Sequence, residues 1–132
     1  DSLIDETPRI IAVDEVYRLM RHPSLLDFLI EAAKTFRTRR KKLISIDQQM
    51  SVMLEGKARL VFENSPSRVI VSQRQGMNVF HEDAAFQHLN QQHRDIIAAL
   101  PRFHYVLDIQ DEGLWYLFNR PTQGEILRFQ TT

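Results

Sequence analysis

Cysteine is absent from the 132-residue chain, which excludes disulfide bonds, thiolate nucleophiles and zinc sites built on thiolates. No apolar run approaches the roughly 18 residues that a membrane-spanning helix needs. An excess of charge of one sign is also lacking, because 17 basic side chains balance 17 acidic ones. This balance argues against a protein whose whole surface binds nucleic acid or acidic lipid. Glycine is scarce, with four residues, so few backbone positions are free to wrap a phosphate group.

The residues that are present are those of an ordinary globular domain. Hydrophobic residues make up 43% of the chain and charged residues 26%, which is not the composition of a disordered segment. A chain of this length buries about two-thirds of its unfolded surface, enough for a hydrophobic core. The chain begins at Asp1 and not at a methionine, so we expect a processed product or a part of a longer, intracellular protein.

Hydrophobic patterning predicts an alternation of strands and helices. Short β-branched runs predict strands at residues 9–13, 43–46 and 68–72, the first of them buried on both faces. Apolar residues at helical spacing after Pro23 predict a helix over residues 23–40. Weaker patterns predict helices at 16–20, 50–63, 82–89 and 91–100. Strands joined by helices favour a parallel sheet with right-handed crossovers.

The end of the chain changes period. Strand-like runs at residues 103–109 and 114–118 flank Asp111-Glu112-Gly113, which predicts a β-hairpin. A shorter run predicts a final strand at 124–129. The expected fold class is therefore α/β, with parallel strands and crossover helices followed by a carboxyl-terminal β-hairpin.

Two acids follow the first predicted strand. An apolar strand that runs into Asp14-Glu15 is the pattern of a Walker B segment. In such a segment Asp14 can hold Mg²⁺ through its water shell, and Glu15 can orient or deprotonate an attacking water. The alternative interpretation is that the two acids stabilise the amino terminus of the following helix.

Polar residues of two further kinds lie near the second predicted strand. Gln48 follows it, where an amide can sense a γ-phosphate or position a water, although it can equally cap the next helix. Six cations precede the strand, and they either balance a helix carboxyl terminus or include an arginine finger for a neighbouring subunit. A third interpretation is that residues 37–42 contact DNA. The six cations are Lys34, Arg37, Arg39, Arg40, Lys41 and Lys42.

Together these stretches resemble a known family. Residues 9–49 are similar to the carboxyl-terminal half of the ATPase core of conjugation and type IV secretion ATPases (VirB/Tra-type), in the FtsK–HerA superfamily of RecA-like P-loop ATPases. The matching stretches are Ile10-Ile11-Ala12-Val13-Asp14-Glu15, Phe36-Arg37-Thr38-Arg39, Leu43-Ile44-Ser45-Ile46-Asp47-Gln48, and Phe62-Glu63-Asn64 leading to Arg68-Val69-Ile70-Val71. The sequence departs from the family at Asp47, where threonine is usual, and at Lys41, where glycine is frequent.

The resemblance implies roles for single residues. Asp14 is the Walker B acid on the Mg²⁺ side, Glu15 the catalytic base, Gln48 the sensor, and Arg37 or Arg39 the finger. The resemblance also implies ATP and Mg²⁺ as cofactors of the parent protein and a hexamer of identical copies. Other implied features are contacts with further secretion-system subunits and a cytoplasmic location at the inner face of the bacterial membrane. Within residues 1–132, the Walker B and sensor half is expected at 9–75, and a helical pair with the hairpin at 80–130.

A Walker A loop is missing from this sequence. None of the four glycines begins Gly-x-x-x-x-Gly-Lys-[Ser/Thr], and Gly56-Lys57, the nearest approach, is followed by Ala58. We therefore expect the carboxyl-terminal part of a larger ATPase, inactive alone and without bound nucleotide. The alternatives are a non-catalytic RecA-like interaction or assembly module and a DNA-translocating motor of the same superfamily.

The missing loop also bears on strand pairing. In RecA-like sheets, as the resemblance implies, the Walker A strand lies between the sensor strand and the strand that follows it. Without that strand, residues 68–72 are expected to move beside 43–46 or to pair with another chain. The five histidines show no spacing typical of a metal site, and we expect structural or surface roles for them.

Overall fold

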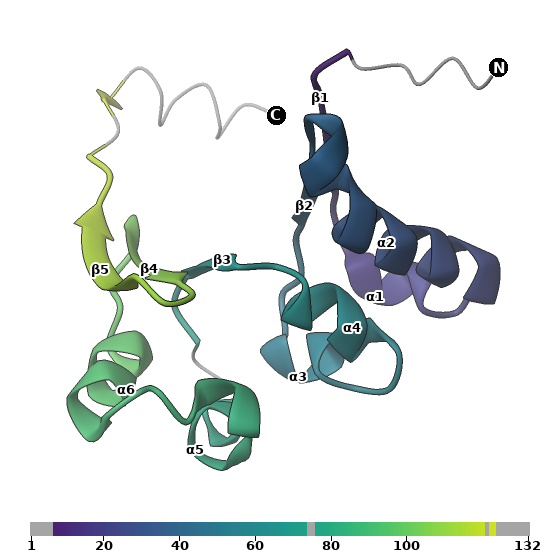
Figure 1. Cartoon of the computed structure of the whole chain (residues 1–132). Helices are drawn as coiled ribbons and strands as arrows, with labels where there is room; N and C mark the ends of the chain where they lie inside the picture. The colour runs from purple at the N-terminus through teal and green to yellow at the C-terminus, as the bar shows by residue number, and fades with distance from the viewer. Residues whose placement is uncertain (1–6, 74–75, 121, 124–132) are drawn as a thin grey trace, which may run out of the picture. The chain divides into compact units, whose positions relative to one another are not determined.

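The computed structural model describes residues 7–73, 76–120 and 122–123 (Figure 1). Its contacts divide the chain into two compact units, Asp1–Ser65 and Pro66–Thr132. The strand predicted at 124–129 lies outside the described residues. Among the residues described, no helix is long and apolar enough to cross a membrane.

The first unit contains a two-stranded parallel sheet, as predicted. Strand β1 (Arg9–Val13) pairs with β2 (Lys41–Ser45) in a continuous parallel register. The connection between them holds α1 (Val16–Leu19), α2 (Pro23–Thr35) and the 3₁₀ helix η1 (Phe36–Arg39). Two short helices follow β2, namely α3 (Met50–Met53) and α4 (Ala58–Glu63).

Helix α2 supplies the largest share of the core of the first unit. Its residues Leu26, Leu29 and Ile30 recur at helical spacing and are buried, so they form one apolar stripe along the helix. Helix α4 packs against α2 and buries Val61 and Phe62. The remaining core residues of this unit are Val16, Ala32, Met53, Leu54 and Ala58.

The sheet of the first unit is covered on one face only. Ile11 and Val13 are half-buried, whereas Ile10 is 67% exposed and Ile44 of β2 is 47% exposed. The prediction that the first strand is buried on both faces is therefore wrong for the described residues. Side chains alternate between the two faces of a strand, and only the face with Ile11 and Val13 is shielded.

The second unit is organised around a three-stranded antiparallel sheet with the order β3-β4-β5 (Figure 1). Its strands are β3 (Ser67–Ile70), β4 (His104–Ile109) and β5 (Gly113–Phe118). Between β3 and β4 lie α5 (Asn78–Glu82), the 3₁₀ helix η2 (Ala84–Phe86) and α6 (Gln91–Ala98). The core forms on one face of this sheet, and its buried residues are Ile70, Phe80, Phe86, Leu89, Ile97, Leu100 and Val106.

One strand pairs differently from the expectation. The strand predicted at 68–72 pairs antiparallel with β4, with Ile70 opposite Val106, and does not lie beside β2 in a parallel sheet. The physical reason is that β4 offers β3 a hydrogen-bonding edge and a shared apolar face within the same unit. The predicted hairpin is confirmed, because β4 and β5 pair antiparallel across a turn with positive φ at Asp111 and Gly113.

Candidate functional site

The carboxyl ends of β1 and β2 are joined by hydrogen bonds. The amide of Ile46 donates to the carbonyl of Val13 at 2.9 Å, and the amide of Val16 donates to the carbonyl of Ile46 at 3.2 Å. These bonds extend the parallel ladder beyond both strands. The structure therefore brings together, at one edge of the sheet, the residues predicted from the ends of the two strands: Asp14, Glu15, Asp47 and Gln48.

Glu15 occupies a strained position between β1 and α1. Its backbone is left-handed, with φ 51° and ψ 52°, a conformation that non-glycine residues rarely adopt. Its amide donates to Oδ1 of Asp14 at 2.8 Å, which supports the sharp turn from strand to helix. Backbone strain of this kind is often retained where a side chain must point in a particular direction.

The Glu15 carboxylate has a cationic partner on the next helix. Nε of Arg18 lies 2.8 Å from Oε2 of Glu15 and also donates to the Tyr17 hydroxyl at 3.1 Å. The bond to Tyr17, and then the charge of Glu15, raise the pKa of Arg18 above its usual value. Arg18 therefore stays charged, and Glu15 is held by this pair in the present arrangement. The Asp14 side chain is exposed.

Asp47 uses both carboxylate oxygens to fix the local backbone. Oδ2 accepts from the amide of Tyr17 at 2.8 Å, and Oδ1 accepts from the amide of Gln49 at 3.2 Å. From its place just after β2, Asp47 thus satisfies an amide in the first turn of α1. Gln48, beside it, is exposed.

Arg37 and Arg39 are not brought to this edge. Both lie on η1, which leads into the amino end of β2, and both are exposed. The five residues of β2 separate that end from the acids by about 16 Å at the usual rise of a strand. Within one chain, neither arginine is therefore placed next to Asp14 or Glu15.

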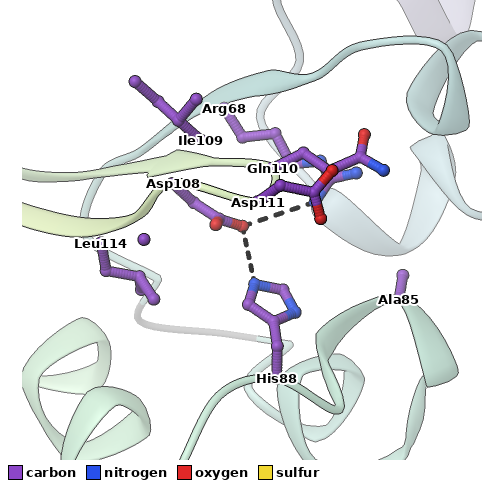
Figure 2. Close-up of a pocket in the computed structure, with 9 residues that line it drawn as sticks. Arg68, Ala85, His88, Asp108, Ile109, Gln110, Asp111 and Leu114 are labelled. Atoms are coloured by element: carbon purple, nitrogen blue, oxygen red, sulfur yellow. Dashed lines mark hydrogen bonds and ion pairs between the residues drawn. The ribbon is translucent and has the colours of Figure 1, made fainter.

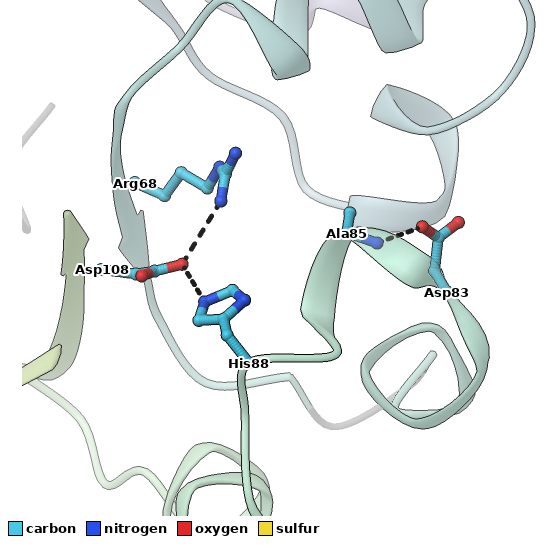
Figure 3. A network of polar contacts seen from close by, with 5 residues as sticks. All are labelled: Arg68, Asp83, Ala85, His88 and Asp108. Atoms are coloured by element: carbon cyan, nitrogen blue, oxygen red, sulfur yellow. Dashed lines mark hydrogen bonds and ion pairs between the residues drawn. The ribbon is translucent and has the colours of Figure 1, made fainter. Parts of the chain in front are cut away.

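The second unit contains a half-open pocket of about 500 Å³ (Figure 2). Asp108 of β4 lines this pocket, and its side chain is 3% exposed. It contacts the side chains of Arg68 and His88. Nη1 of Arg68 lies 3.4 Å from Oδ2 of Asp108, and Nε2 of His88 lies 3.0 Å from the same oxygen (Figure 3). The other lining residues are Ala85, Ile109, Gln110, Asp111, Gly113 and Leu114.

This network connects three separate segments of the second unit. Arg68 comes from β3, Asp108 from β4, and His88 from the segment between η2 and α6. A histidine oriented by a buried carboxylate can serve as a base or as a metal ligand. The lining residues include no serine, threonine or cysteine nucleophile, and among the described residues no group of three potential metal ligands occurs. We interpret the network as a tie that holds the helical segment on the sheet.

The sequence interpretation did not single out Asp108. Its only signal is an acid inside the otherwise apolar run of β4, and that signal does not reveal its partners. Arg68 and His88 stand 40 and 20 positions away along the chain, so no local spacing connects them. The expectation of a structural or surface role fits His88, because its ring is partly exposed and bonded to Asp108.

Comparison with solved structures gives a likeness over most of the chain. No protein-family profile and no curated protein matches the chain. The solved structure of VirB4 of Thermoanaerobacter pseudethanolicus matches with a TM-score of 0.73 at 18% sequence identity. The match covers 92% of this chain and 34% of VirB4, so the chain spans about a third of that protein. The chain therefore has the fold of a portion of VirB4, in agreement with the resemblance to type IV secretion ATPases carried by its motifs.

Proposed function

We propose that this chain is the Walker B and sensor portion of an ATPase that energises conjugative DNA transfer or type IV secretion by hydrolysing ATP. One observation supports the proposal above the others. In a fold like that of VirB4, Asp14 and Glu15 lie at the same sheet edge as Gln48. Ligands of parallel sheets bind at that edge.

The residues at this edge suit a Mg²⁺-nucleotide. Asp14 is exposed and its Oδ1 accepts the amide of the next residue, which leaves Oδ2 to hold a hydrated Mg²⁺ as far as the described residues show. When bound, Mg²⁺ would neutralise charge on the phosphates. Glu15 would orient or deprotonate the attacking water once its carboxylate separates from Arg18. Gln48 would position the same water or sense the γ-phosphate.

The two arginine candidates act on a neighbouring copy in this proposal. Arg37 and Arg39 are exposed at the opposite end of β2 from the acids, which suits an arginine finger supplied between subunits. A hexamer of the parent protein would present each finger to the next nucleotide. In the same proposal the parent protein contacts other secretion-system subunits and lies in the cytoplasm at the inner face of the bacterial membrane.

The decisive experiment substitutes the proposed base in the full-length protein that carries this segment. Glu15→Gln should abolish ATP turnover, measured as phosphate release, while ATP binding persists, because the amide cannot accept a proton. Glu55→Gln is the matched control, since Glu55 is exposed in the loop between α3 and α4. Turnover that survives Glu15→Gln at the control level would overturn the assignment of the base.

A non-catalytic assembly module is the second candidate. It is supported by the engagement of the acids in internal contacts, Glu15 with Arg18 and Asp47 with two backbone amides. In that case the full-length protein would show no ATP turnover, and Glu15→Gln would change nothing except local stability. The same experiment therefore separates the two candidates.

A further inference from the structure

The side chain of Arg18 makes contacts that bear on the proposed base. Its Nε lies 2.8 Å from Oε2 of Glu15 and donates to the Tyr17 hydroxyl at 3.1 Å. The guanidinium carbon also lies 5.8 Å from the centroid of the Tyr17 ring. A carboxylate and an aromatic side chain therefore hold the Arg18 guanidinium together.

The backbone that carries these side chains is fixed to the sheet edge. Val16 is fully buried, and its amide donates to the carbonyl of Ile46. The amide of Tyr17 donates to Oδ2 of Asp47 at 2.8 Å. Both acceptors belong to the two residues that follow β2, so α1 is anchored at its first two residues. The ion pair beside this anchor therefore forms where the fold places it, and is not a chance contact of two mobile side chains.

The ion pair occupies an oxygen that the proposed reaction needs. A general base must lie within hydrogen-bond distance of the water whose proton it accepts. Oε2 of Glu15 contacts the guanidinium in this arrangement, so the carboxylate is turned toward α1. The left-handed backbone of Glu15, with φ 51°, is strain of the kind that is kept at sites that change conformation.

We infer that Arg18 is a positioning residue that restrains Glu15, so that the base acts only after this ion pair opens. The inference rests on the proposed function, because it concerns the regulation of the proposed base. The Arg18 side chain is 68% exposed and the Glu15 side chain 30% exposed. An exposed ion pair is weak and opens readily, so it slows the base a few-fold and does not block it. Arg18 therefore sets the basal rate of turnover.

The test compares steady-state ATP turnover of Arg18→Gln and of the wild type in the full-length protein that carries this segment. We expect kcat to rise about 2- to 5-fold, the factor that corresponds to an exposed ion pair, with KM for ATP unchanged. Arg18→Lys keeps the charge and should stay near the wild-type kcat. Arg21→Gln is the matched control, since it removes an exposed cation three residues further along the chain. A kcat that is unchanged or lowered in Arg18→Gln would overturn the inference.

A spectroscopic measurement on the 132-residue chain tests the ion pair without ATP turnover. The Nε–Hε resonance of Arg18 in a nitrogen–proton NMR spectrum should shift when Glu15→Gln removes the carboxylate charge, and when Tyr17→Phe removes the hydroxyl. The corresponding resonance of Arg21 should not move. If neither variant moves the Arg18 resonance, the pair does not form in solution and the inference fails.

The variants at Glu15 and Arg18 separate failure of this inference from failure of the proposed function. If Glu15→Gln abolishes turnover and Arg18→Gln does not raise kcat, the base is supported and only the restraint is refuted. If turnover survives Glu15→Gln, or the full-length protein has none, the proposed function fails and the restraint fails with it. A higher kcat in Arg18→Gln together with lost turnover in Glu15→Gln supports both.

Discussion

Asp108 is the only charged residue that is buried among the described part of the chain, with 2% of its surface exposed. A lone buried carboxylate is strongly unfavourable, because the interior cannot replace its hydration. Asp108 is tolerated because Arg68 and His88 both contact its Oδ2. Such a contact fixes which segments pack together more than it raises overall stability.

Replacing Asp108 should therefore be costly. Asp108→Asn removes the buried negative charge that both Arg68 and His88 contact, and should lower the local free energy of unfolding by about 3–5 kcal/mol. Hydrogen exchange of the β4 amides measures this change. Asp111→Asn, at an exposed position of the same pocket, is the control and should stay within about 0.5 kcal/mol. Equal protection in both variants would show that the network has no structural role.

The sequence predicted where the acids after β1 lie, but not the contacts that Asp47 makes. The pattern of an apolar strand followed by two acids was sufficient to select Asp14 and Glu15 as neighbours of the second strand end. The pattern could not predict that Asp47 accepts the Tyr17 amide, because the two residues stand 30 positions apart along the chain. Contacts over such a distance follow from the pairing of β1 with β2, which no local spacing encodes.

The helix predicted over 50–63 is interrupted. Gly56 has φ +50° and separates α3 from α4, whereas the apolar periodicity runs through it. A glycine in the left-handed region is a common way to end one helix before another begins. The sequence carries a signal for this break, because a glycine inside a predicted helix has a low helix propensity.

Gly56→Ala should destabilise the first unit by about 1–2 kcal/mol, the cost of a left-handed alanine. No other atoms lie within 4 Å of the added Cβ, so the cost is one of backbone conformation and not of a clash. Gly56→Asn should lose less, since asparagine tolerates this conformation better. Thermal unfolding compares the two variants, and an alanine variant as stable as the wild type would contradict the strain.

The sheets show where periodicity succeeds and where it fails. The strand–helix–strand order predicted the parallel β1–β2 pairing, and the strand-like runs on either side of Asp111-Glu112-Gly113 predicted the β4–β5 hairpin. Neither signal predicted the partner of β3, since an apolar strand can pair with either sheet. In the structure β3 pairs with β4, where Ile70 lies opposite Val106 and Val69 lies opposite Leu107.

The whole chain lacks a phosphate-binding loop, and this predicts its behaviour alone. Calorimetry of the 132-residue chain with Mg·ATP should detect no tight binding, because no glycine-rich loop supplies backbone amides to the phosphates. The same titration of the full-length protein that carries this segment is the positive control. A micromolar dissociation constant for the chain alone would mean that it binds nucleotide by other residues, and the proposed division of the site would fail.

The amino-acid sequence was sufficient to predict the type of most elements, the acids at the end of β1, and a resemblance that agrees in fold with VirB4. Those features are local: they depend on periodicity over a few residues and on polar residues that directly follow an apolar run. Three features became visible only in the folded chain: the pairing of β3 with β4, the burial of Asp108 between Arg68 and His88, and the separation of the arginines on η1 from the acids. These depend on contacts between residues far apart in the chain, whose free energies are set by burial and geometry and not by spacing.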